Sequence, residues 1–133
     1  MRKKSKGLAV IYAGVLLTIA ACASQQQLVT IGPAKGETAL EMKADDFKFE
    51  PNNIKAFEGD VIVLRIENKS NSGHNFTIKD PEGNALQSAA LPPKETVSVK
   101  VALSKAGVYE FYCDKPFHPA LGMKGKITVE QGP

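Results

Sequence analysis

The sequence predicts an all-β fold, a two-sheet sandwich of about seven or eight strands. Apolar residues keep no helical period over any window long enough for a helix. Short runs rich in β-branched and aromatic residues recur along the chain instead, several of them alternating with polar residues. Residues suited to tight turns, such as Gly59-Asp60 and Asn71-Ser72-Gly73, separate these runs.

The strands are expected in seven runs, which are Thr38–Met42, Ile54–Phe57, Val61–Glu67, Asn75–Ile78, Thr96–Leu103, Val108–Tyr112 and Lys126–Glu130. A sandwich buries the inner face of each sheet, so alternate apolar residues should point inward. The expected inward residues are Phe47, Phe49, Ile54, Val61, Val63, Ile66, Phe76, Val99, Val101, Tyr109 and Phe111.

Residues 1–21 are expected to be an export signal. Four basic residues among the first six precede Gly7–Ala21, an apolar run without charge that ends on small residues. This run is shorter than the about 20 apolar residues of a membrane-spanning helix, so a retained anchor is the weaker interpretation.

Ile19-Ala20-Ala21-Cys22 resembles the lipobox of bacterial lipoproteins, which implies cleavage before Cys22 and acylation of that residue, with palmitate among the acyl groups. We therefore expect an exported protein on the periplasmic or cell-surface side of a membrane, anchored through Cys22. Residues 22–37 would form the lipidated end and a flexible tether, and residues 38–133 the folded domain. The alternative is an ordinary signal peptide that leaves Cys22 as a free thiol.

Charge excludes nucleic acid as a partner. The chain has 17 basic and 14 acidic residues, and removal of the signal takes away four of the basic ones. The remaining 13 basic and 14 acidic residues give a formal charge of −1, without a basic cluster. A single domain of this size is expected to be a monomer.

Candidate metal ligands are concentrated near the carboxyl end. Cys113, His118 and Met123 follow the spacing C-x4-H-x4-M, and His74, the other histidine of the chain, precedes a predicted strand. Thiolate, imidazole and a weak thioether are the donors that select copper in a trigonal site with a long axial bond. Each residue alone has an ordinary structural interpretation, namely a surface histidine, a buried thiol or a packing methionine. The joint pattern favours one copper site.

The domain resembles the cupredoxins, the type 1 blue copper proteins. The resemblance rests on four segments, which are Asp46-Phe47-Lys48-Phe49-Glu50-Pro51, Glu58-Gly59-Asp60, Gly73-His74-Asn75-Phe76 and Gly107-Val108-Tyr109-Glu110-Phe111-Tyr112-Cys113. The spacing in the loop is similar to rusticyanin-like proteins and the Gly-His-Asn order to azurin, with plastocyanin in the same family. The resemblance implies a Greek-key sandwich and one type 1 copper bound by His74, Cys113, His118 and Met123.

The resemblance also implies roles for the neighbours of the ligands. Asn75 would brace the ligand strand against the copper loop, and the Gly73 carbonyl could add a weak contact to the metal. The family often has glycine before the loop histidine, where this chain has Phe117. Because Pro119 stiffens the other side of His118, we expect an unusual turn in the loop.

A metal with four protein donors has no open position for substrate, so we expect outer-sphere single-electron transfer and no enzymatic activity. Redox proteins such as cytochrome c, an oxidase or a reductase are the expected partners. The expected docking patch around His118 consists of uncharged residues, namely Pro116, Phe117, Pro119, Ala120 and Leu121.

Other functions fit the sequence less well. A periplasmic copper-binding or trafficking protein of the same fold is the main alternative, although such proteins favour more exposed Met and His donors. A copper enzyme or a dinuclear copper site would need further histidines or a second cysteine in the loop. Cysteine hydrolase chemistry, with Cys113 as nucleophile, His118 as base and Asn75 as orienting residue, lacks the helix that commonly activates such a thiol. A cupredoxin domain without metal would not need all four ligands.

Overall fold

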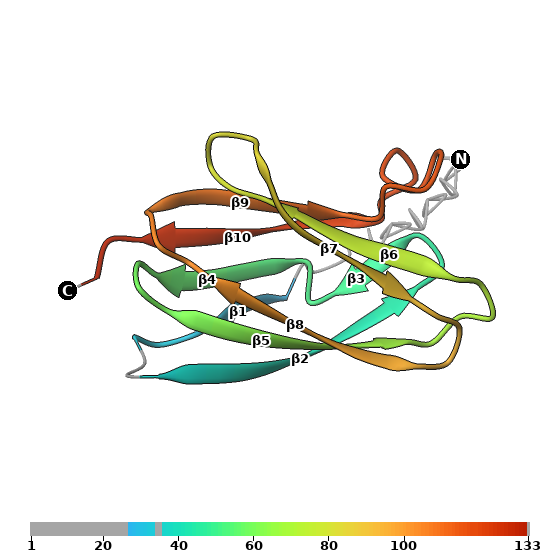
Figure 1. Ribbon diagram of the computed structural model, residues 1–133, viewed down its shortest axis with the longest axis horizontal. Helices are drawn as coiled ribbons and strands as arrows, with labels where there is room; N and C mark the ends of the chain where they lie inside the picture. Colours follow the sequence, from blue (N-terminus) through green and yellow to red (C-terminus); the bar gives the residue numbers. More distant parts are fainter. Residues whose placement is uncertain (1–26, 34–35, 133) are drawn as a thin grey trace, which may run out of the picture.

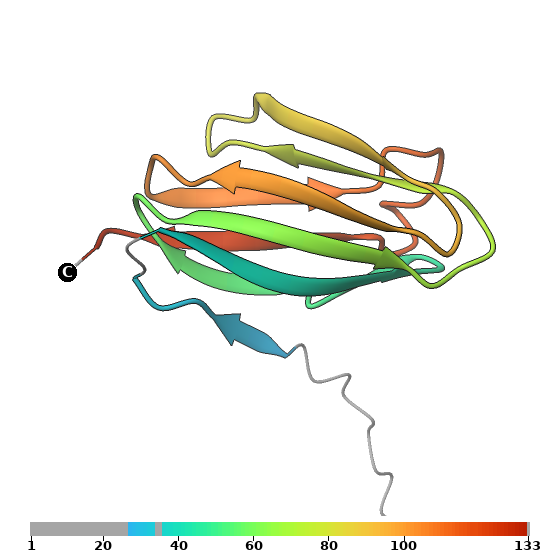
Figure 2. The same cartoon turned by 60° about the horizontal axis from the view of Figure 1, so that its bottom comes forward.

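The computed structural model describes residues 27–33 and 36–132, and these residues form a two-layer β-sandwich without helices (Figure 1). The prediction of an all-β sandwich is therefore confirmed. One layer has six strands in the order β1-β4-β10-β9-β6-β7, and the other has four in the order β3-β2-β5-β8. The two sheets lie face to face, as Figure 2 shows from a second direction.

The first sheet consists of β1 (Leu28–Thr30), β4 (Asn53–Phe57), β10 (Lys124–Glu130), β9 (Gly107–Tyr112), β6 (His74–Lys79) and β7 (Ala85–Leu91). The second consists of β3 (Lys48–Glu50), β2 (Glu37–Asp45), β5 (Val61–Asn68) and β8 (Thr96–Ala102). Both sheets are mixed. β4 runs parallel to β1 and to β10, and β2 runs parallel to β5, while the remaining pairs are antiparallel.

The described residues contain ten strands, three more than the runs identified in the sequence. β7 gave little signal because its sequence, ALQSAAL, is mostly small or polar, and five of its seven residues are exposed. β3 has only three residues. β1 lies within the segment expected to be a tether, and there the Ile31 amide also donates to the Lys55 carbonyl at 2.8 Å. The ordered part of the domain thus begins before residue 38. The predicted signal and Cys22 lie outside the described residues.

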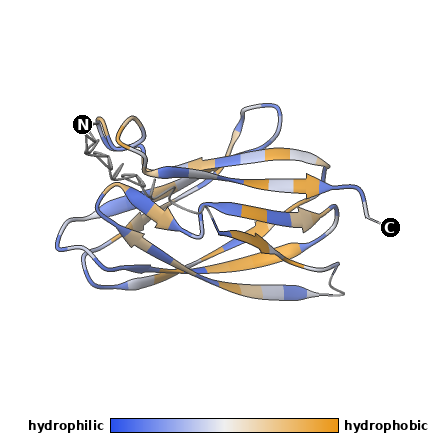
Figure 3. Ribbon diagram, turned by 180° about the vertical axis from the view of Figure 1, so that it is seen from behind, coloured by the Kyte–Doolittle hydropathy of each residue, from blue (hydrophilic) through white to orange (hydrophobic). Residues whose placement is uncertain are grey.

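The core lies between the two sheets and is built around three phenylalanines. Phe49, Phe76 and Phe111 are fully buried, and their ring centroids lie 5.2 to 5.7 Å apart. Edge-to-face and stacked contacts of this kind add to the free energy gained by burial. Figure 3 shows how hydrophobic and hydrophilic residues alternate along several strands, as a half-buried sheet requires.

The predicted core was wrong at three positions. Phe47 is 41% exposed and lies in the turn between β2 and β3. In β5 the buried residues are Ile62, Leu64 and Ile66, so the predicted Val61 and Val63 belong to the opposite, half-buried face. Because side chains alternate strictly along a strand, Ile66 and Val63 could not both point inward.

The sheet order decides where the strand ends meet. β9 pairs antiparallel with both β6 and β10, and the register places Tyr112 opposite Thr77 on one side and Lys124 on the other. The first residue of β6, the end of β9 and the start of β10 therefore lie at the same end of the sandwich, on the right of Figure 1. Among the residues that the structure describes, no helix has the length and apolar character needed to cross a membrane.

Candidate metal centre

Three predicted ligands meet at this end of the sandwich. His74 is the first residue of β6, Cys113 directly follows β9, and His118 lies in the loop of residues 113–123 that connects β9 to β10, here named the copper loop. Two of the predicted ligands, His74 and Cys113, therefore lie on or directly after adjacent strands. The rigid hydrogen-bonded sheet fixes the positions of His74 and Cys113, and the loop brings His118 between them.

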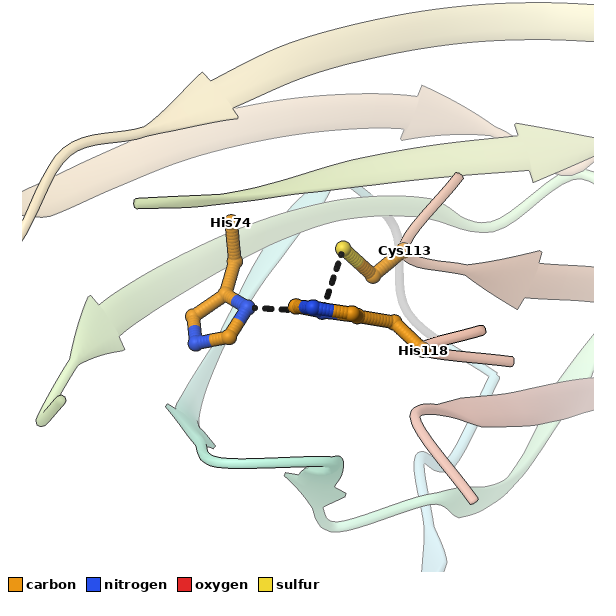
Figure 4. Close-up of side chains that lie close together, drawn as sticks. All are labelled: His74, Cys113 and His118. Atoms are coloured by element: carbon orange, nitrogen blue, oxygen red, sulfur yellow. Dashed lines mark hydrogen bonds between the residues drawn. The ribbon is translucent and has the colours of Figure 1, made fainter. Parts of the chain in front are cut away.

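The donor atoms of these three residues converge (Figure 4). His74 Nδ1 lies 3.2 Å from His118 Nδ1, and His118 Nδ1 lies 3.5 Å from Cys113 Sγ. One ligand atom from each residue can be chosen so that all three lie within 4.8 Å of one another. His74 and Cys113 are buried and His118 is half-buried, so only His118 is partly open to solvent.

Met123, the fourth predicted ligand, is fully buried where the copper loop meets β10. The backbone of Met123 makes two hydrogen bonds within the copper loop, one through its carbonyl and one through its amide. The Cys113 amide donates to the Met123 carbonyl at 3.1 Å, and the Met123 amide donates to the His118 carbonyl at 3.0 Å. These two bonds hold Met123 directly beside the residues that carry the thiol and the loop imidazole.

The copper loop is a sequence of tight turns. The His118 amide donates to the Lys115 carbonyl at 3.1 Å, and the Leu121 amide donates to the Phe117 carbonyl at 3.0 Å. Phe117 has a φ of 67°, in the left-handed region that glycine adopts most readily. Phe117, which stands where the family resemblance leads us to expect glycine, thus has a glycine-like backbone conformation, and the turn before His118 is unusual for a phenylalanine.

A polar network that the sequence analysis missed orients His74. Ser70 Oγ lies 3.0 Å from His74 Nε2, and Asn68 Oδ1 accepts a hydrogen bond from the Ser70 hydroxyl at 2.9 Å. The buried Asn68 amide in turn donates to the carbonyls of Ser72 and Leu91. Since Nε2 is engaged, Nδ1 is the nitrogen that faces Cys113 and His118. The polar run from Asn68 to Ser72, at the end of a β-branched strand, was the available signal.

Two further predicted neighbours lie beside the ligands. The Asp114 amide donates to Asn75 Oδ1 at 2.8 Å, so this side chain joins β6 to the start of the copper loop. The Gly73 carbonyl accepts a hydrogen bond from the Lys115 ammonium. The loop is therefore attached to the segment of His74 at two points, one through Asn75 and one through Lys115.

Electrostatics favour the neutral, metal-binding form of His74. Burial lowers the pKa of His74, His118 pushes this pKa in the same direction, and the carboxylate of Asp46 partly opposes both. Asp46 Oδ1 lies 3.7 Å from His74 Nε2 and is itself well exposed. A histidine with a lowered pKa keeps a free lone pair at neutral pH, which coordination requires.

The residues present fit a single copper ion. Two imidazole nitrogens and one thiol sulfur converge in a mostly buried position, and a buried methionine adjoins them. This combination of soft sulfur and imidazole donors is the one that selects copper over Mg²⁺, Ca²⁺ or Mn²⁺. His74, Cys113 and His118 thus form a metal site whose chemistry suits copper.

The loop residues on either side of His118 are apolar. Phe117 is 79% exposed and Leu121 is 59% exposed, so neither side chain turns inward to cap the core. Pro116 and Ala120 are exposed as well, and Pro119 is half-buried. Phe47, which was expected in the core, adds a further aromatic ring beside His118.

Comparison with known proteins agrees with this geometry. The sequence profile of the cupredoxin-like domain matches residues 9–129. Plastocyanin of Capsella bursa-pastoris is 32% identical over 91 residues, which cover 61% of this chain and 86% of that protein. Plastocyanin of Daucus carota is 30% identical over 100 residues, which cover 68% of this chain and 97% of that protein.

Solved structures show the same fold. Dithionite-reduced auracyanin of Roseiflexus castenholzii superposes with a TM-score of 0.62 at 20% identity, covering 74% of this chain and 99% of that one. Auracyanin A of Chloroflexus aurantiacus, a "blue" copper protein, superposes with a TM-score of 0.61 at 21% identity, covering 71% of this chain and all of that one. Together with the sequence matches, these similarities show that the chain belongs to the cupredoxin-like family.

Proposed function

We propose that this protein is a single-electron carrier with one type 1 copper, which His74, Cys113, His118 and Met123 bind. The observation that carries the proposal is the convergence of His74 Nδ1, His118 Nδ1 and Cys113 Sγ at one end of the sandwich. When bound, the copper would supply a one-electron couple. The plastocyanins and auracyanins to which the chain is similar support this assignment.

The protein's own residues would hold the ligands in place during electron transfer. His74 is fixed by its strand and by Ser70, and the start of the copper loop is fixed by Asn75. Ligands held in place by a sheet change position little between the two oxidation states of a metal. The reorganisation energy of electron transfer is therefore small. Both histidines of the chain belong to this one site. No histidine is left for a second copper centre of the kind that copper enzymes use, so the proposal is a carrier and not an enzyme.

Partner proteins would dock on the apolar surface around His118. Phe117 and Leu121 project from the copper loop into solvent, and His118 is the ligand with the greatest exposure. Redox complexes form and separate rapidly, and a small uncharged contact area permits both. We propose a cytochrome c or an oxidase or reductase subunit as the kind of partner, with this protein acting as a monomer.

The proposed location is the outer side of a membrane, periplasmic or at the cell surface, with the domain tethered through acylated Cys22. The basic start, the uncharged apolar run and the lipobox-like Ile19-Ala20-Ala21-Cys22 support it. Mass spectrometry of the protein from membranes of the expressing cell tests it. We expect an acylated Cys22 as the first residue, and an unmodified residue at the cleavage point would contradict the anchor.

Addition of Cu(II) to the purified protein tests the copper proposal. We expect one equivalent to bind and to produce an intense blue colour with the narrow hyperfine splitting of a type 1 site. Cys113→Ser should abolish the colour, because the copper–thiolate bond is its source. Met123→Leu should retain the colour with a shifted reduction potential, since the axial ligand tunes the potential. Colourless binding by the unmodified protein would refute the type 1 site, and rapid loss of copper to a chelator would favour a copper-trafficking function.

A further inference from the structure

One turn of the second sheet contacts both histidines. The turn between β2 and β3, at Asp46 and Phe47, belongs to the four-stranded sheet, whereas His74 and His118 come from the six-stranded sheet and its loop. Asp46 Oδ1 lies 3.7 Å from His74 Nε2. The Phe47 ring lies 5.1 Å from the His118 ring, centroid to centroid, with 71° between the planes. A segment that supplies no predicted ligand therefore contacts both histidines of the proposed centre.

Phe47 is not a fully buried core residue, and its backbone is not in a conformation that phenylalanine prefers. The side chain is 41% exposed, and the residue has a φ of 60°, a left-handed conformation that residues other than glycine disfavour. Its backbone also packs on the copper loop, since a Cβ added to Gly122 would lie 3.4 Å from the Phe47 carbonyl oxygen. Neither intrinsic backbone preference nor core packing explains an aromatic residue in this turn. A contact with His118 does.

We propose that Phe47 is a positioning residue for His118. Its ring holds the His118 imidazole in an edge-to-face contact on the side that faces the turn between β2 and β3. This inference rests on the proposed copper function, because it assigns Phe47 to a proposed ligand. His118 is the ligand that a loop carries and solvent partly reaches, so its ring is restrained less than that of His74. A neighbouring aromatic ring restricts the rotation of such an imidazole and keeps water from one side of it.

Phe117 provides a matched control. It is also a phenylalanine with positive φ, at 67°, and it lies next to His118 in the chain, yet it is 79% exposed and makes none of the ring contacts found in the described part of the chain. Replacement by leucine at either position keeps an apolar side chain and the same backbone strain. Only Phe47→Leu removes an aromatic contact with the ligand.

The first measurement is the rate at which the copper-loaded full chain releases copper to a chelator in excess. We expect Phe47→Leu to speed the release about two- to twelvefold, the range that an aromatic pair of this geometry supports. Its paramagnetic resonance spectrum should change as well. Phe47→Tyr should restore the original rate and spectrum because it keeps the ring, and Phe117→Leu should change both much less than Phe47→Leu does. Equal release rates for Phe47→Leu and Phe117→Leu would overturn the proposal.

The second measurement needs no metal and so separates this inference from the copper function. In the metal-free chain, Phe47→Leu should shift the NMR resonances of the His118 ring protons through loss of the ring current, while Phe117→Leu should shift them much less. If the protein bound no copper but this difference appeared, the copper function would fail and the contact would stand. Unshifted His118 resonances would overturn the inference. A Phe47→Leu chain that no longer folds would overturn it too, since Phe47 would then be a structural residue.

Discussion

At the scale of single residues, the orientation of His74 depends on Ser70, a buried polar residue outside the hydrophobic core. Ser70 Oγ lies 3.0 Å from His74 Nε2 and also bonds Asn68 Oδ1 and the Ser72 carbonyl. Because Ser70 and His74 are both buried, loss of the hydroxyl leaves His74 Nε2 without this hydrogen-bond partner, whereas Asn68 Oδ1 and the Ser72 carbonyl each keep another bond. Ligand affinity at metal sites depends strongly on such outer contacts.

Ser70→Ala should therefore weaken copper binding. We expect the dissociation constant to rise about 10- to 100-fold, the usual effect of removing a partner that orients a ligand histidine. Competition with a chromophoric copper chelator measures it. Ser98→Ala is the matched control, because Ser98 is exposed on β8 in the other sheet. Equal affinities for the two variants would show that Ser70 does not orient His74.

At the scale of elements, β5 shows how strict alternation fixes a strand. Its buried residues Ile62, Leu64 and Ile66 face the other sheet, and Arg65 faces solvent. β5 pairs with β2 along eight residues and with β8 along seven, so it is one of the two inner strands of its sheet. A slip by one residue would bury Arg65 and expose three aliphatic side chains.

Leu64→Ala should lower the free energy of unfolding by about 2–5 kcal/mol, as expected for a cavity in a packed core. Val63→Ala, one position along the strand on the half-buried face, should cost only about 1 kcal/mol. Urea unfolding of the metal-free variants gives both values. A larger loss for Val63→Ala than for Leu64→Ala would contradict the register.

The copper loop is the second element whose behaviour can be tested. Leu121 is 59% exposed beside Phe117, within the apolar surface proposed for docking. A charged side chain placed there must lose its hydration when another protein docks on this surface. When two copies of the protein meet, the two added charges also repel each other.

Leu121→Lys should slow electron self-exchange between the oxidised and reduced copper-loaded protein about tenfold at low salt, since like charges then face each other in the encounter complex. NMR line broadening in mixtures of the two forms measures the rate. Leu86→Lys is the control, because Leu86 is 48% exposed on β7, outside the copper loop. Unchanged exchange in Leu121→Lys would refute the docking surface.

At the scale of the whole molecule, burial of His74 couples the metal centre to folding. Burial lowers the pKa of His74 below 6.5, with His118 acting in the same direction, whereas the unfolded chain keeps the ordinary value. Below about pH 6.5 the unfolded chain then binds more protons than the folded one, so stability falls as the pH falls. Above the unfolded pKa, this contribution to stability is fully present.

The metal-free protein should accordingly lose stability as the pH falls below 6.5, the ordinary pKa of histidine, and a His74→Gln variant should lose less over the same interval. Urea unfolding at a series of pH values measures both curves. Parallel curves for the two proteins would show that His74 does not contribute to the pH dependence.

Much of the fold followed from the sequence because a sandwich imposes a local pattern. Alternating β-branched runs and turn residues predicted the all-β class and seven of the ten described strands, and these are present. β7 could not be predicted, because most of its residues are exposed and its sequence shows no alternation of apolar and polar residues. Phe47 was assigned to the core for its hydrophobicity alone, whereas the turn that carries it directs the ring to His118.

The residue types and spacing of His74, Cys113, His118 and Met123 already specify in the sequence which donor atoms are available for a metal. How those donors meet, and what holds them, depends on contacts between distant parts of the fold. The pairing of β9 with β6 and β10 is a contact between segments far apart in the chain, and the approach of Phe47 and Ser70 to the two histidines depends on it. Local sequence cannot encode such contacts, because they form only when both sheets close around a common core.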